Sequence, residues 1–306
     1  MPVSRGPPKN MGTWICRSVH ENLELASGCK FCRCIPAPVL TNTMKSSLSA
    51  RVRSRPFGRS TRAGGYAERC KQMEFAELSE KLKAASTATL TSVLRNKGLH
   101  NTFMHQVVPL KADMKMVGRA FTLRYIPARE DLDEVPLDNL KDVQRIGIER
   151  ITKGEILVID ARGDTRAGTM GSILAARIQM RGCMGIVTDG AYRDSPTIAA
   201  SGLPAYAAAM NAHTNKTIHY PSEIQVPVAC GGVAIYPGDL IVGDEEGVVV
   251  IPAQLAEEVA VEAEEMEEIE RFIMEKIRAG ASIVGTYPPD EMTLAEYQGW
   301  KEARAK

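Results

Sequence analysis

Residues 154–194 read GEILVIDARGDTRAGTMGSILAARIQMRGCMGIVTDGAYRD, and this pattern predicts a strand, a glycine-rich loop, a helix and a second strand. The apolar runs 155–160 and 185–188 are the predicted strands, and residues 172–181 form the predicted helix. A helix that connects two neighbouring strands in this way makes a crossover, and the two strands then run parallel. The sequence therefore predicts an α/β fold.

Further elements are predicted on both sides of this unit. Upstream, residues 74–97 predict two short helices, residues 117–125 a strand, and residues 137–150 a helix. Beyond residue 201, short apolar runs separated by Gly, Pro and Asp predict a compact set of strands joined by tight turns. A glutamate-rich helix with one apolar face is predicted from about residue 253 to 279, and the tail after it contains a last short helix.

The charge of the chain is divided unevenly. The 306 residues contain 38 Lys and Arg against 37 Asp and Glu, which gives a net charge of +1. Residues 1–72 contain 13 basic and 3 acidic residues, a balance of +10, so residues 73–306 have a balance of −9. No stretch approaches the roughly 18 uninterrupted apolar residues of a membrane helix. We therefore expect a basic extension over 1–72 and one acidic domain over 73–306, without a membrane partner.

The basic extension shows no sustained apolar period and is rich in Arg, Ser, Gly and Pro, which is typical of a disordered segment. Two origins fit it: an organellar presequence over residues 44–72, or a misassigned start, with Met73 as the natural first residue. Three cysteines form a cluster in this extension: Cys29, Cys32 and Cys34. The cluster has neither the second pair of cysteines nor the nearby His that a zinc site usually includes. The basic residues lack the interleaved aromatics of a nucleic-acid site. We expect the domain to be cytoplasmic and to bind no nucleic acid.

Polar residues follow both strands of the predicted crossover. The loop GDTRAGTMG contains Gly168 and Gly171 and leads directly into a helix, whose N-terminal amides favour a carboxylate or phosphate. Asp189, Arg193 and Asp194 come at the end of the next strand, and ligands gather at the carboxyl ends of parallel strands. An Arg can bind a carboxylate bidentately, and a nearby carboxylate can bind Mg²⁺. A plain structural turn and a surface ion pair are the alternatives.

Two separated signatures give the chain a family resemblance. The runs GSILAARIQMRGCMGIVTDGAYRD and VPVACGGVAIYPGDLIVGDEEGVVVIP resemble the RraA-like family, over roughly residues 76–280. This family includes the 4-hydroxy-4-methyl-2-oxoglutarate aldolases, which are class II pyruvate aldolases, and the RraA regulators of ribonuclease E. The resemblance implies a swivelling α/β/β sandwich, assembled as a homotrimer or a hexamer, with sites at subunit interfaces.

The resemblance also implies roles for individual residues. Arg193 would bind the carboxylate and enolate oxygen of pyruvate, and Asp194 would ligate Mg²⁺ or Mn²⁺. A backbone cradle for the substrate would comprise Gly171, Ser172, Ile173 and Leu174. The acid with which the aldolases of the family organise metal-bound water falls on Ser172. A serine can hydrogen-bond water but cannot act as a carboxylate base, so another carboxylate, such as Asp164 or one across an interface, would have to replace it.

These features lead to two hypotheses of different classes. The first is a divalent-metal-dependent lyase that cleaves or decarboxylates a 2-oxo acid through a pyruvate enolate, with oxaloacetate decarboxylase as a side activity. Decarboxylation needs no base to deprotonate a hydroxyl group, so it should tolerate Ser172 better than aldol cleavage does. The second is a non-catalytic RraA-like regulator that binds an RNA-processing enzyme.

Several other residues have less specific interpretations. His213 and His219 are either metal ligands or, as we expect, polar residues at a subunit interface. Cys183 and Cys230 lie in apolar surroundings and are expected in the core. Residues 244–246 form an acidic sequence between glycines and predict a turn.

Overall fold

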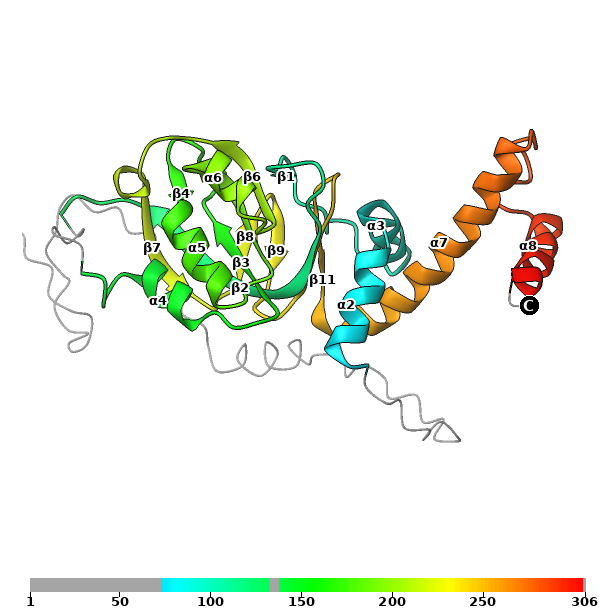
Figure 1. Cartoon of the computed structure of the whole chain (residues 1–306), viewed down its shortest axis with the longest axis horizontal. Coiled ribbons are helices and arrows are strands. Elements are labelled where there is room, and N and C mark those ends of the chain that lie inside the picture. Colours follow the sequence, from blue (N-terminus) through cyan, green and yellow to red (C-terminus); the bar gives the residue numbers. More distant parts are fainter. Residues whose placement is uncertain (1–72, 132–137, 305–306) are drawn as a thin grey trace, which may run out of the picture. The chain divides into compact units, whose positions relative to one another are not determined.

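The computed structural model describes residues 73–131 and 138–304 (Figure 1). They belong to one compact unit of the chain, Arg69–Lys306. The predicted disordered extension, the presequence and the cysteine cluster lie outside the described residues. No helix among the described residues is long and apolar enough to span a bilayer.

The strands of the described residues form one large mixed sheet and one small hairpin. Their bounds are β1 (Val108–Pro109), β2 (Met116–Pro127), β3 (Glu155–Asp160), β4 (Gly168–Met170), β5 (Gly185–Tyr192), β6 (Ala205–Met210), β7 (His219–Ile224), β8 (Val228–Cys230), β9 (Val233–Ile235), β10 (Leu240–Gly243) and β11 (Val248–Ile251). In the large sheet the order is β1-β6-β5-β3-β2-β10-β11, with β4 beside β5 and β7 beside β2. The pairs β2–β3, β3–β5 and β5–β6 are parallel, which confirms the predicted crossover.

The helices lie in two groups. Their bounds are α2 (Phe75–Ala84), α3 (Thr87–Asn96), α4 (Val143–Arg150), α5 (Ser172–Met180), α6 (Ser195–Ala200), α7 (Ala256–Arg278) and α8 (Glu291–Arg304), with the short 3₁₀ turns η1 (Asn215–Thr217) and η2 (Ala253–Leu255). Helices α4, α5 and α6 accompany the parallel strands, whereas α2, α3 and α7 lie together beyond β11 (Figure 1). The β8–β9 hairpin packs against β2 and β3. The predicted layered α/β class is confirmed.

Two apolar cores correspond to these groups. The larger core contains β3 and β5, which are buried on both faces, together with the inner face of α5. A second core joins α2, α3 and α7 to one face of β10 and β11. The predicted acidic helix is confirmed as α7, with Val259 and Ile273 on its buried face. The expected turn at residues 244–246 joins β10 to β11.

Two of the predicted boundaries differ in the structure, and one strand was not predicted. Helix α4 starts at Val143 rather than residue 137, because the Asp142 carboxylate accepts the backbone N–H of Arg145 at 3.0 Å and caps the helix. Strand β5 continues to Tyr192 rather than ending at residue 188. The glycine-rich loop contains a short strand, β4, that the sequence analysis did not predict.

Candidate active site

Strand β4 brings the glycine-rich loop to the end of β5. The two strands pair in parallel, with Met170 opposite Tyr192. The backbone N–H of Arg193 then donates to the carbonyl oxygen of Met170, at 3.0 Å. Since α5 begins two residues after β4 ends, Arg193 and Asp194 lie directly beside the N-terminus of α5.

The Asp194 carboxylate occupies this helix end. Its Oδ2 accepts hydrogen bonds from the backbone N–H and from the hydroxyl of Ser172, each at 3.2 Å. Gly171 permits this approach, because a Cβ there would lie 2.9 Å from the same oxygen. The backbone of Asp194 has a φ of 55°, which is uncommon for a residue other than glycine and is found most often at functional sites. The positive end of the α5 dipole thus faces a carboxylate.

Gly168 is the tightest point of this arrangement. A Cβ there would lie 2.6 Å from the backbone nitrogen and 2.7 Å from the Cβ of Arg193, neither of which can rotate away. We therefore expect Gly168→Ala to lower the free energy of unfolding by about 2 kcal/mol, the usual cost of an overpacked site. Chemical denaturation measures this, with Gly299→Ala as the control, since Gly299 has open space around it. Equal midpoints for the two variants would contradict the packing described.

A cavity of about 410 Å³ opens at the same place. The residues that line it include five of the predicted ones: Gly171, Ile173, Leu174, Arg193 and Asp194. Ser172 is not one of the lining residues, because its amide and hydroxyl are directed to Asp194. The Arg193 and Asp194 side chains are 50% and 40% exposed, and Arg193 Nε lies 3.7 Å from Asp194 Oδ1. A small anion can therefore reach both.

The wall of the cavity also contains two basic residues that the sequence analysis missed, Arg145 and Lys216. Lys216 Nζ donates to the Asp142 carboxylate at 2.6 Å, and an Arg145 guanidinium nitrogen lies 3.3 Å from its other oxygen. Burial alone would raise the pKa of Asp142. The hydrogen bonds from Lys216 and from the Arg145 backbone outweigh it and hold that pKa below its usual value. Asp142 therefore stays ionised between the two cations.

One signal in the sequence could have located Lys216. Strand β6 is parallel to β5, so the residues that follow Met210 also lie at the carboxyl edge of the sheet. Arg145 gave no comparable signal, because its position depends on where α4 begins. The Asp142 cap sets that start.

Asp189 lies level with the end of β3, at the expected edge of the sheet, but it does not line the cavity. Its side chain is buried inside β5, where it accepts the backbone N–H groups of Ala161 and Gly163 at 2.7 and 3.0 Å. Burial raises the pKa of Asp189, and these two hydrogen bonds partly offset the rise. The residue fastens the start of the glycine-rich loop to the strand.

The remaining predicted residues are divided between core and surface. Cys183 and Cys230 are buried free thiols, as expected. His213 is exposed, but His219 is buried and stacks on Tyr125 with ring centroids 5.5 Å apart. The interface role expected for His219 is therefore wrong, because its ring is covered by its own subunit.

The donor set at the cavity fits some metals and not others. Within residues 73–131 and 138–304, no three His, Cys, Asp or Glu side chains gather closely enough to enclose an ion. Asp194 offers one accessible carboxylate, which suits Mg²⁺ or Mn²⁺ with several bound waters and does not suit a closed zinc site. Asp164, the proposed replacement for the acid missing at Ser172, does not line the cavity, and a hydrogen bond from Arg166 lowers its pKa to about 2.

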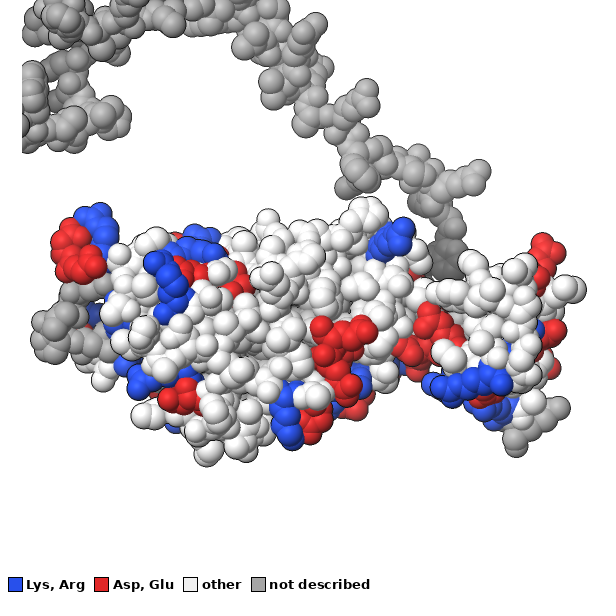
Figure 2. Space-filling model, turned by 90° about the horizontal axis from the view of Figure 1, so that it is seen from above, with Lys and Arg blue, Asp and Glu red and all other residues white. Residues whose placement is uncertain are grey.

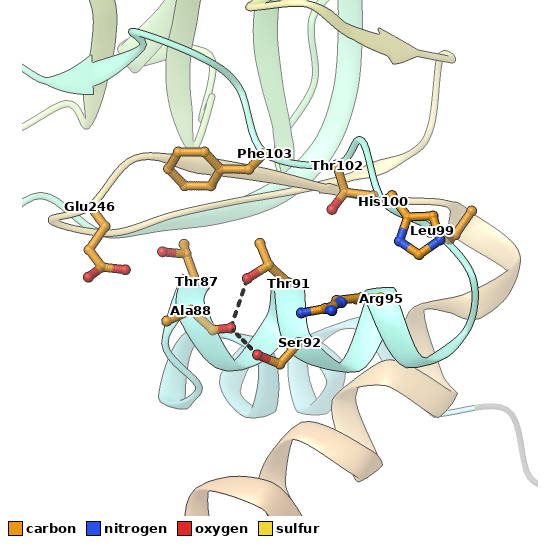
Figure 3. Close-up of a pocket in the computed structure, with 10 residues that line it drawn as sticks. All are labelled: Thr87, Ala88, Thr91, Ser92, Arg95, Leu99, His100, Thr102, Phe103 and Glu246. Atoms are coloured by element: carbon orange, nitrogen blue, oxygen red, sulfur yellow. Dashed lines mark hydrogen bonds between the residues drawn. The ribbon is translucent and has the colours of Figure 1, made fainter.

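A second hollow, of about 590 Å³, lies between α3 and residues 99–103 (Figure 3). The hydroxyls of Thr91 and Ser92 on its wall both donate to the carbonyl of Ala88, at 2.8 and 3.0 Å. These hydroxyls are bonded to their own helix rather than directed at a ligand. The cavity at Arg193 is therefore the better candidate for an active site.

Comparisons with known proteins agree with this fold. The sequence model of the family described as RraA-like, Aldolase/RraA, matches residues 77–250. Over 177 residues the chain is 32% identical to a Halalkalibacterium halodurans protein provisionally named a 4-hydroxy-4-methyl-2-oxoglutarate aldolase. The aligned part is 56% of this chain and 79% of that protein. Protein DlpA of Legionella pneumophila is 27% identical over 206 residues, or 67% of this chain, and this chain spans about a third of DlpA (32%).

A solved structure is similar as well. Streptomyces coelicolor RraAS2 is described as an unusual member of the RNase ES inhibitor RraA protein family. It superposes with a TM-score of 0.59 at 32% identity, over 64% of this chain and 94% of RraAS2. With the family match extending over more than half of the chain, the chain belongs to the RraA-like family of aldolases and RraA proteins.

Proposed function

We propose that this protein is a divalent-metal-dependent lyase that cleaves or decarboxylates a 2-oxo acid through the enolate of pyruvate. The observation that carries the proposal is the Arg193–Asp194 pair at the N-terminus of α5, open to a cavity of about 410 Å³. The provisional names of the aldolase relatives support the same reaction class.

The residues of the chain would bind and orient the substrate. The Arg193 guanidinium can hold the carboxylate of a 2-oxo acid through two parallel hydrogen bonds. Asp194 accepts the amide of Ser172, and among the described residues no side chain accepts the amides of Ile173 and Leu174, so these two amides are available as further donors to the same anion. Because Arg193 and Asp194 line the same cavity, a substrate held in this way would present its 2-oxo oxygen to Asp194.

A divalent ion bound by Asp194 would add positive charge where negative charge develops on the 2-oxo oxygen as the carbon–carbon bond breaks. Asp194 is held for this role by the two donors of Ser172. Arg193 is attached to β4 through its backbone N–H, so the point from which its side chain extends is fixed. Such preorganised charge needs little rearrangement during the reaction.

The test is an assay of pyruvate release from oxaloacetate and from 4-hydroxy-4-methyl-2-oxoglutarate, with and without Mg²⁺. We expect release that depends on the metal, with oxaloacetate as the faster substrate because Ser172 cannot act as a base. Release that is absent, or unchanged by EDTA, would overturn the proposal.

Ser172→Asp is expected to change the balance between the two reactions. A carboxylate at this position can act as a base, so we expect aldol cleavage to rise about a hundredfold, at the low end of what a positioned base contributes. Oxaloacetate decarboxylation should hardly change, because it requires no such base. The ratio of the two rates is the measurement, and Ser172→Asn is the uncharged control. A parallel rise in both rates would show that residue 172 acts on the metal or the fold instead.

The similarity to RraAS2 favours a second candidate, a non-catalytic regulator of an RNA-processing ribonuclease. On the face shown in Figure 2, basic and acidic side chains lie in small mixed groups rather than in one basic surface that could follow RNA. The regulator would therefore bind the ribonuclease itself. Capture of the enzyme after nuclease treatment, together with no metal-dependent turnover, would favour this candidate over the lyase.

The homotrimer or hexamer remains a prediction that solution mass measurements can test. Ile173 at the rim of the cavity is 83% exposed, and Met180 on the same helix is 81% exposed. We propose that a second copy of the chain covers this face of α5.

A further inference from the structure

Two cations in the wall of the cavity are held by one buried acid. The Asp142 carboxylate is 2% exposed, while the Lys216 and Arg145 side chains are 34% and 31% exposed. Both cations line the cavity, and Asp142 does not. The charges of the three residues sum to +1. Because only the two cations line the cavity, the excess positive charge faces it.

This wall is fixed relative to the rest of the site. Asn215, next to Lys216, donates to the Gln144 side chain at 3.2 Å, and Gln144 donates to the carbonyl of Thr169 in β4 at 2.8 Å. Strand β4 also receives the backbone N–H of Arg193. Hydrogen bonds thus connect the Arg145–Lys216 wall to the Arg193–Asp194 wall, and the distance between them is preorganised.

We infer that Arg145 is a specificity-determining residue, positioned together with Lys216 by Asp142, and that it binds a second carboxylate at the end of the substrate remote from the 2-oxo acid group. The inference rests on the proposed function for the orientation of the substrate, with its 2-oxo acid end at Arg193. A guanidinium binds a carboxylate through two donors of fixed geometry. The ammonium group of a lysine, on its flexible side chain, binds a carboxylate less selectively. The cavity is large enough for more than a three-carbon acid.

Binding of two ligands of equal chain length tests the inference. 2-Oxoglutarate ends in a carboxylate and 2-oxopentanoate ends in a methyl group, and both can be titrated calorimetrically into the protein with Mg²⁺. We expect the protein to prefer 2-oxoglutarate roughly tenfold or more, the usual value of a charge-assisted hydrogen bond. Arg145→Gln should remove most of this preference by weakening 2-oxoglutarate alone.

Two further variants separate a specific role from a general one. Arg145→Lys keeps the charge and loses the planar fork, so it should retain only part of the preference. Arg177→Gln removes an exposed arginine of α5 that pairs with Glu149 and does not line the cavity, and it should leave both affinities unchanged. Folding should survive in Arg145→Gln, because the backbone N–H of residue 145 still reaches Asp142.

Equal affinity for the two ligands, or an undiminished preference in Arg145→Gln, would overturn the inference. Failure of the proposed function looks different, since 2-oxoglutarate would still be preferred while no Mg²⁺-dependent pyruvate release occurred.

Discussion

Asp194→Asn is expected to lower the Mg²⁺-dependent rate of pyruvate release from oxaloacetate roughly 10³-fold, because a metal contributes several kcal/mol to such a transition state. Asparagine has the same shape and keeps an oxygen that can accept the Ser172 donors. It lacks the charge that holds the ion. Steady-state rates over a range of Mg²⁺ concentrations measure the effect.

The matched control is Asp113→Asn, which removes an exposed carboxylate that pairs with Lys111 outside the cavity. It should leave the rate unchanged. EDTA should lower the wild-type rate to the level of Asp194→Asn and have no further effect on that variant. If Asp194→Asn kept the full rate, or if EDTA still lowered the rate of Asp194→Asn, the ion would be bound elsewhere.

Arg193→Lys is expected to lower kcat/KM for oxaloacetate roughly 10²-fold, because one charge-assisted contact of a bidentate pair is lost along with its geometry. The backbone N–H of residue 193 still donates to Met170, so the loop should keep its position. Much of the loss should be in kcat if Arg193 also stabilises charge on the 2-oxo oxygen. Rates measured at saturating and at low substrate concentration separate the two contributions.

Arg166→Lys is the control for this second prediction. Arg166 is 72% exposed at its side chain and pairs with Asp164 rather than with cavity residues. We expect wild-type kinetics from it. If Arg193→Lys also had wild-type kinetics, the guanidinium would have no role in binding the 2-oxo acid.

The part of the site that depends on local sequence could be predicted. The loop before Ser172 and the polar residues after the apolar run of β5 indicated a helix N-terminus beside Arg193 and Asp194, and the structure brings these residues together. The crossover that makes this possible can be predicted from the order of strand, helix and strand along the sequence alone. A parallel pair follows from that order whatever the rest of the chain does.

The part of the site that depends on long-range hydrogen bonds could not be predicted. The apolar run predicted a strand that ends at residue 188, but pairing with β4 and β6 continues β5 to Tyr192, and the amides of Ala161 and Gly163 bind the Asp189 carboxylate within it. Asp189 is 28 residues from Ala161 and 26 residues from Gly163 in the sequence.

The wall that contains Arg145 and Lys216 was missed for a similar reason. Asp142 and Lys216 are 74 residues apart, and only the folded sheet brings them within 2.6 Å. Composition and spacing contain no sign of such a pair. The parallel order of β5 and β6 is what places both walls around one cavity.

A crystal structure of the protein with Mn²⁺ and pyruvate tests the central claim most directly, because the anomalous signal of Mn²⁺ locates the ion independently of any interpretation of the site. The account predicts an anomalous peak bonded to a carboxylate oxygen of Asp194, with the carboxylate of pyruvate on Arg193 and at the first turn of α5. A peak bonded to other residues, or pyruvate bound away from Arg193 while metal-dependent turnover persists, would contradict it.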